Sequence, residues 1–179
     1  MRHKRVIKIW YFAIPLLFGM VPQEQPSREQ QLKAAFLCNF TQFVTWPDSV
    51  FSDAEAPLII GILGNDPFGT YLDQTILGET ANDRPLLLKR YDSVQEVDSH
   101  ILFINLPKQS ELVGALAVLK KQPVLTVGDV NGFTRQGGII RFVPEGNRIR
   151  LRVNLKAANA AGLIISSKLL RLSEVVNPN

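Results

Sequence analysis

Apolar side chains recur every three or four positions between Glu29 and Trp46, which is the period of an amphipathic helix. Ser27 can cap the free N–H groups at the start of this helix, and Pro47 is expected to end it. The core-facing positions are Leu32, Phe36, Phe40 and Phe43, flanked by Leu37 and Val44. The sequence therefore predicts one long helix at the start of the folded body.

A continuously apolar run rich in β-branched residues follows at 57–64. Such a run is typical of a central parallel strand that is covered on both faces. In the turn at 64–69, Asp66 can cap the next helix, and Pro67 suits its first position. We expect that helix to run through about Leu77.

Strands and helices then alternate along the middle of the chain. The pattern predicts strands at 84–90, 100–105 and 123–127, a brief helix near 93–97 and a longer helix over 107–121. This alternation indicates a mostly parallel sheet with helices on both of its faces.

The C-terminal part changes character. Residues 137–143 and 148–153 flank a turn at 144–147 and are predicted to form an antiparallel hairpin. The fold class that we expect is therefore α/β, a three-layer sandwich with a mostly parallel sheet and this hairpin at its C-terminal edge.

Two short helices are expected after the hairpin. Asn154 is a suitable cap for an alanine-rich helix, and Gly162 lies just beyond its end. Residues 163–166 are expected to be extended. Ser167 could cap a terminal helix that carries Leu169, Leu170 and Leu172.

The N-terminus has the pattern of an export signal. Four basic residues precede an apolar stretch at 9–21, which is shorter than the roughly 20 residues of a membrane span. We interpret 1–22 as a signal peptide, with an uncleaved anchor as the alternative. Residues 23–30 form a polar spacer, and 31–176 a single α/β domain.

Charge and metal-ligand content exclude several classes of function. The formal net charge is +4, but the excess comes from Arg2, Lys4, Arg5 and Lys8, so nucleic-acid binding is not expected. One cysteine and two histidines are too few for a zinc or iron–sulfur site and allow no intramolecular disulfide. We expect no cofactor. Cys38 is either a buried apolar residue or a thiol that links two chains.

Arginines dominate the hairpin. Arg148, Arg150 and Arg152 alternate along one strand and share a face with Arg141 of the neighbouring strand. Residues 130–179 carry a net charge of +6 and residues 23–129 a net charge of −6. The arginines bind an anionic ligand, bind an acidic partner surface, or form a solvated face.

Three other residues are candidates for ligand or partner binding. Asp66 and Phe68 lie in the turn at 64–69, where open α/β sheets often bind ligands, although a structural turn explains them better. Trp46 is either an interaction residue or a core anchor.

Two groups of residues are candidates for catalysis. His100 could pair with Asp98, and Ser166, Ser167 and Lys168 superficially suggest a serine–lysine nucleophile. Structural roles explain both groups more simply. We therefore expect no enzymatic activity.

Several blocks of the sequence together resemble the YfiR-like family of periplasmic proteins. The resemblance covers roughly residues 30–175. Its ordered blocks are 33–40 with Phe43, Trp46 and Pro47, then 64–69, 100–104, 123–127, 137–140 and 161–170. The chain departs from the family pattern at Cys38, where tyrosine is more frequent, and in lacking the cysteine pairs of some members.

The resemblance implies a non-enzymatic periplasmic regulator. Such proteins bind the periplasmic sensor part of an inner-membrane diguanylate cyclase, which lowers cyclic-di-GMP and biofilm formation. A homodimer and a small anionic or aromatic effector are further expectations. The alternative is an exported small-molecule or anion-binding module that serves another membrane receptor.

Overall fold

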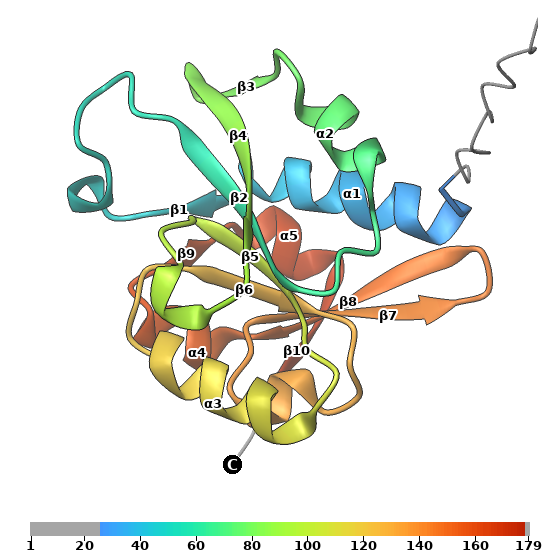
Figure 1. Cartoon of the computed structure of the whole chain (residues 1–179). Helices are drawn as coiled ribbons and strands as arrows, with labels where there is room; N and C mark the ends of the chain where they lie inside the picture. Colours follow the sequence, from blue (N-terminus) through green and yellow to red (C-terminus); the bar gives the residue numbers. More distant parts are fainter. Residues whose placement is uncertain (1–25, 178–179) are drawn as a thin grey trace, which may run out of the picture.

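The computed structural model describes residues 26–177, so the expected signal peptide at 1–22 lies outside the described residues. An eight-stranded sheet forms the centre of the molecule (Figure 1). The strands of residues 26–177, of which all but β1 and β9 belong to this sheet, are β1 (Val44–Thr45), β2 (Leu58–Gly64), β3 (Thr80–Ala81), β4 (Arg84–Tyr91), β5 (Ile101–Asn105), β6 (Leu125–Gly128), β7 (Ile140–Glu145), β8 (Arg148–Asn154), β9 (Ile164–Ile165) and β10 (Ser173–Val176). The α-helices are α1 (Arg28–Phe40), α2 (Thr70–Ile76), α3 (Gln109–Leu119), α4 (Leu155–Ala160) and α5 (Ser167–Arg171). Short 3-10 turns are η1 (Asp48–Val50), η2 (Val94–Glu96) and η3 (Phe133–Gln136).

The strand order confirms the predicted fold class. The order is β10-β8-β7-β6-β5-β2-β4-β3, and all neighbours are parallel except the pairs β7–β8 and β3–β4. The antiparallel hairpin β7–β8 lies on the C-terminal side of the sheet, and β10 adds one strand outside it. Strands β1 and β9 form a separate two-stranded antiparallel sheet.

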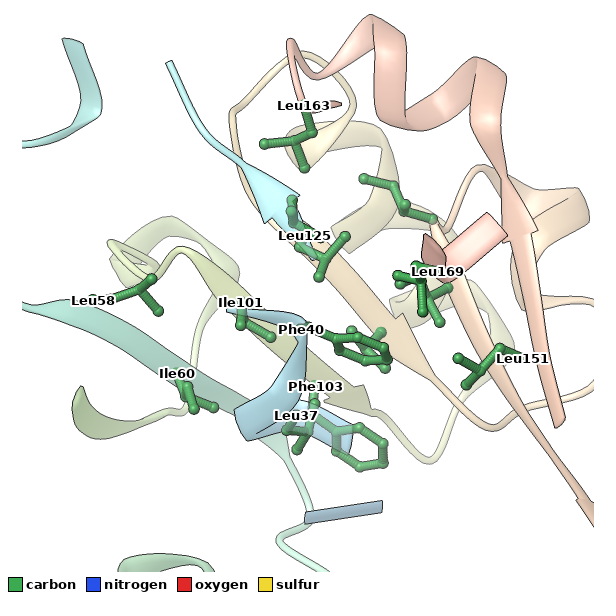
Figure 2. Close-up of a cluster of buried hydrophobic side chains, with 14 of the residues drawn as sticks. Leu37, Phe40, Leu58, Ile60, Ile101, Phe103, Leu125, Leu151, Leu163 and Leu169 are labelled. Atoms are coloured by element: carbon green, nitrogen blue, oxygen red, sulfur yellow. The ribbon is translucent and has the colours of Figure 1, made fainter. Parts of the chain in front are cut away.

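Each face of the sheet carries its own core. Along β5, Ile101 and Phe103 belong to one buried cluster, while Leu102 and Ile104 belong to the other, because successive side chains of a strand point to opposite faces. The first cluster includes side chains of α1, α2, α4 and α5, and the second includes side chains of α3. Figure 2 shows Leu37 and Phe40 of α1 and Leu169 of α5 in the first cluster. The helices therefore cover both faces, as the alternation of strands and helices predicts.

The first helix is shorter than its apolar pattern suggests. Ser27 caps it as predicted, with its hydroxyl accepting from the Gln30 N–H, but the helix ends at Phe40 rather than near Trp46. Pro47 does not end it, because the chain turns earlier, at Thr41. Val44 then enters β1 opposite Ile165, and the carbonyl oxygen of the neighbouring Phe43 accepts from the Ser166 N–H, so a distant segment holds this part of the chain.

The prediction for the C-terminal end was partly wrong. The last helix is capped by Ser166, not Ser167, and it ends at Arg171. The chain then pairs with β8 as the parallel strand β10, which leaves the Leu172 side chain 73% exposed. The helical spacing of Leu169, Leu170 and Leu172 could not predict this strand, because the strand depends on pairing with β8, which is distant in the sequence. The Asn154 cap of α4 is confirmed, since its side chain accepts from the Ala157 N–H.

Candidate functional site

The arginines of the hairpin lie on one face, as predicted. Arg148 and Arg150 are exposed, Arg152 is half-buried, and the residues between them, Ile149 and Leu151, face the other way. We call Arg141, Arg148, Arg150 and Arg152 the arginine face. It belongs to a hairpin that projects from the rest of the molecule (Figure 1).

The ion pairs on this face are local and solvent-exposed. The Nε atom of Arg150 lies 2.6 Å from a carboxylate oxygen of Glu145, and that of Arg152 lies 2.8 Å from one of Glu174 on β10. Arg148 has no ion pair among residues 26–177. Exposed pairs of this kind contribute at most about 1 kcal/mol, so carboxylates of a partner could replace them at little cost.

Two of the arginines form the wall of a cavity. Arg141 and Arg152 face each other directly across β7 and β8. They join Arg135 of η3 around a cavity of about 280 Å³, which we call the arginine pocket. The remaining lining residues are Asn131, Gly132, Thr134, Val176 and Asn177. Arg148 and Arg150 do not line this pocket, so the structure separates the four predicted arginines into two pairs.

Burial and like charges act together on Arg141. Burial, with Arg152 and Arg135 nearby, lowers the pKa of Arg141 against the opposing effect of Asp129. The Nε–H of Arg141 donates to the carbonyl oxygen of Asp129 in a long bond of 3.4 Å. The pocket therefore holds a partly desolvated positive charge.

A buried lysine connects the pocket to the first helix. The ammonium group of Lys33 lies 2.6 Å from carboxylate oxygens of both Asp129 and Glu29. Burial alone would lower the pKa of Lys33, but its bonds to Asp129 and Glu29 outweigh that effect and raise it. Asp129 is thereby tied to Lys33, which leaves it less able to neutralise Arg141.

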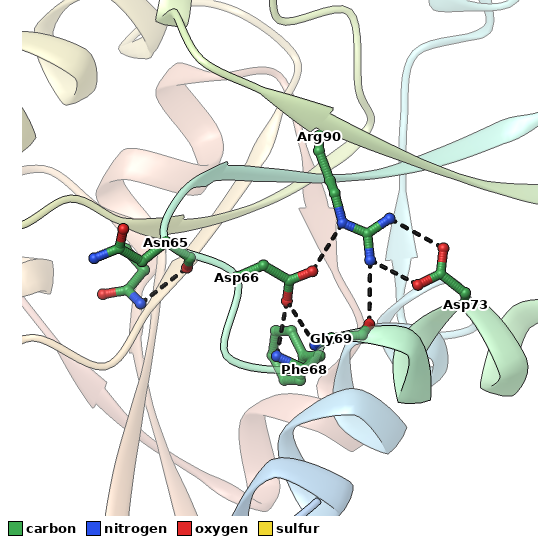
Figure 3. Close-up of polar contacts among 7 residues, drawn as sticks. Asn65, Asp66, Phe68, Gly69, Asp73 and Arg90 are labelled. Carbon is green, nitrogen blue, oxygen red and sulfur yellow. Dashed lines mark hydrogen bonds and ion pairs between the residues drawn. The ribbon is translucent and has the colours of Figure 1, made fainter. Parts of the chain in front are cut away.

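The second predicted site, the turn at 64–69, is filled by the protein's own groups (Figure 3). The Asp66 carboxylate accepts from the N–H groups of Phe68 and Gly69 and pairs with Arg90. Arg90 also binds Asp73 and the Gly69 carbonyl oxygen. Pro67 is not the first helical residue, since α2 begins only at Thr70.

The adjoining strand ends are closed as well. The Asn65 N–H donates to the Asn105 carbonyl oxygen, and the Asn105 amide returns a bond to the Asn65 carbonyl oxygen, both at 2.9 Å. This place lies between β2 and β5, on either side of which the chain order reverses, and ligands of open α/β sheets often bind there. Here the geometry is that of a structural turn.

Two predicted aromatic residues are core residues. Phe68 is buried and meets the Phe103 ring edge to face at 5.1 Å between ring centres. Trp46 is buried, and its indole N–H donates to the His100 carbonyl oxygen at 3.1 Å. Neither side chain reaches the arginine face, and their role in partner binding stays a prediction.

The two candidate catalytic groups have structural partners. Asp98 binds Lys89 and Tyr91 instead of pairing with His100. Ser166 caps α5, and the Lys168 ammonium group lies over the Phe43 ring. Within residues 26–177, no group of three or more potential metal ligands occurs.

Sequence reasoning missed Arg135 and the C-terminal contribution of Val176 and Asn177 to the pocket. Arg135 lies in a short 3-10 turn without periodicity, and Asn177 follows β10, a strand that the sequence pattern did not predict. The one signal that included Arg135 was the excess of basic residues after position 130.

An apolar cavity of about 270 Å³ lies on the other side of β8. It is lined by Phe36, Asn39, Phe40, Phe43, Ile149, Leu151, Leu169 and Leu172. Strand β8 thus separates a cationic surface from an apolar one.

One comparison with known proteins gives a match, and it covers nearly the whole folded body. No curated protein matches the sequence significantly. No helix among residues 26–177 is long and apolar enough to cross a membrane. The family model described as YfiR/HmsC-like matches residues 30–174, from α1 to the start of β10. The chain therefore belongs to the YfiR/HmsC-like family, which supports a general role as a periplasmic regulator of diguanylate cyclase signalling.

Proposed function

We propose that the protein binds the periplasmic sensor part of an inner-membrane diguanylate cyclase and holds the enzyme inactive. This binding lowers cyclic-di-GMP and biofilm formation. The protein performs no chemistry itself. It acts by binding one conformation of the sensor more tightly than another. Such a difference in affinity is what shifts the equilibrium between the two conformations.

The observation that carries this proposal, within a family of regulators, is the exposed end of the arginine face. Arg148 has no ion pair among the described residues, and Arg150 has a partner only in the solvent-exposed Glu145. Both lie on a projecting hairpin in the part of the chain with a net charge of +6. This chemistry suits an acidic patch on the partner, and the charges would accelerate association at low ionic strength.

Genetics tests the regulatory role. Deleting the gene should raise cyclic-di-GMP when the neighbouring membrane cyclase is intact, and should have no effect when that cyclase is also absent. An unchanged level in the first strain would contradict the proposal. A change that persists without the cyclase would favour the alternative, a binding module for another membrane receptor.

Charge reversal tests the surface. The double variant Arg148→Glu/Arg150→Glu should fold normally, fail to co-purify with the cyclase from membranes and fail to restore low cyclic-di-GMP. Lys120→Glu/Lys121→Glu is the matched control, because it makes the same charge change at exposed positions at the end of α3. Equal loss in both variants would mean that overall charge, not the arginine face, decides binding.

A further inference from the structure

The arginine pocket has an excess of positive charge that nearby residues do not fully neutralise. Arg135 makes no hydrogen bond or ion pair with any of residues 26–177. Arg152 uses its Nε atom for Glu174, and Arg141 uses its Nε atom for a backbone carbonyl oxygen. The terminal nitrogens of Arg141 and Arg152 have no acceptor within the same described residues.

Acidic residues balance the charges of these arginines only in part, with Glu174 bound to Arg152 alone. Arg141 and Arg152 are direct cross-strand neighbours, and like charges at such positions destabilise a sheet. Asp129 gives limited relief because Lys33 binds the same carboxylate. An anion in the pocket would remove this repulsion and would accept several charge-assisted hydrogen bonds at once.

The pocket is also held in a defined shape. The ring of Phe133 is fully buried, and the Cα atoms of Gly128 and Gly138 approach it so closely that a methyl group on either would collide with it. This packing fixes η3, and with it Arg135, against β6 and β7. Gly132, which lines the pocket, has a φ of 82°, a conformation that favours glycine.

We propose that the arginine pocket is a binding site for a small phosphate-bearing molecule. Three arginines from different elements line one cavity, and their many N–H donors suit a tetrahedral dianion with several acceptor oxygens better than a planar carboxylate with two. A cavity of about 280 Å³ has room for a phosphate group and a small substituent. The site goes beyond the proposed function, and its occupancy is measured without any partner.

Isothermal titration of inorganic phosphate into the purified protein tests the site. The titration is done at pH 7.5 and constant ionic strength, with chloride as the replaced anion. We expect saturable binding of one phosphate per chain. Arg135→Ala should weaken binding at least tenfold, and because this side chain is exposed and unpaired within the described residues, the variant should keep its fold.

The matched control is Arg148→Ala/Arg150→Ala, which removes two arginines of the same hairpin from outside the pocket. It should bind phosphate as the unmodified protein does. Binding that is absent, or equally strong in Arg135→Ala, would overturn the proposal. Acetate that binds as tightly as phosphate would overturn the choice of phosphate over carboxylate. Loss of binding in the control would place the site elsewhere on the arginine face.

Discussion

His100 accepts a hydrogen bond from the backbone N–H of Ile59 through its Nδ1 atom, at 3.0 Å. The acceptor role requires a neutral ring with its proton on Nε2. The ring also stacks on Phe51 at 4.7 Å between ring centres, and the Arg84 guanidinium lies over that same Phe51 ring at 3.9 Å. His100 thus has the structural role that the sequence favours, and it holds the loop before β2 in place.

This geometry predicts a loss of stability in mild acid. Burial and the charge of Arg84 lower the pKa of His100 against the weaker opposing effect of Asp98. Because the unfolded chain takes up the proton first, the contribution of His100 is complete above about pH 6.5 and falls as the pH drops through its folded-state pKa. Thermal unfolding between pH 7.5 and pH 5 should show a falling midpoint. His100→Phe should be less stable at pH 7.5 and should show a smaller decline; an equal decline would exclude His100 as the cause.

Trp46→Phe should lower stability by about 1 kcal/mol, the usual value of one hydrogen bond. The change removes the indole N–H but keeps an aromatic ring, and the His100 carbonyl oxygen keeps its bond from the Leu125 N–H. Urea unfolding measures the loss. If Trp46 is a core anchor only, the folded variant should still inhibit the cyclase. Lost inhibition at unchanged stability would instead assign Trp46 to the partner surface.

Asp66 and Asp73, which both pair with Arg90, should contribute different amounts to the free energy of unfolding. Asp66→Ala should cost about 1–2 kcal/mol, because two backbone N–H groups lose their acceptor. Asp73→Ala should cost less than about 1 kcal/mol, because Asp73 makes only an exposed ion pair with Arg90. Denaturant titrations of both variants test the order, and the reverse order would contradict the structural account of the turn.

Gly138→Ala should destabilise the protein by about 1–3 kcal/mol, the usual range for overpacking in a core. The new methyl group would lie 2.1 Å from the Phe133 ring unless the structure shifts. Gly114→Ala is the matched control: this glycine lies in α3 with no atom near the added group, and its replacement should stabilise the helix by about 0.5–1 kcal/mol. Equal effects would show that the Phe133 contact does not constrain the fold.

Cys38 should react slowly with thiol reagents. Burial, aided by the charge of Glu79, raises the pKa of the Cys38 thiol to about 11, so almost no thiolate exists near neutral pH. Labelling with a disulfide reagent at pH 7.5 should be slow in native buffer and fast in urea. Rapid native labelling would show that the thiol is accessible and would support the alternative, a thiol that links two chains.

Local patterns predicted much of the fold because they depend on neighbouring residues. The adjacent sequence was enough to predict the helix caps at Ser27 and Asn154 and the apolar strand that ends at Gly64. The end of α1 and the strand β10 could not be predicted in this way, since Val44 and Ser173 find their partners far away in the chain.

The candidate site shows the same division. Strand alternation was enough to place Arg148, Arg150 and Arg152 on one face. It could not show that Arg152 would turn toward Arg135 while Arg150 stays outside, because that grouping depends on how η3 packs onto the sheet.

The pairing of β1 with β9 sets an order of events for biosynthesis. Val44 meets Ile165, so this small sheet joins segments near the two ends of the described chain. The N-terminus leaves the ribosome first, so β1 cannot pair with β9 until nearly all of the protein has been made. Contacts between such distant positions also slow folding. Formation of this small sheet, which closes the molecule, is therefore a late step that follows synthesis of Ile165.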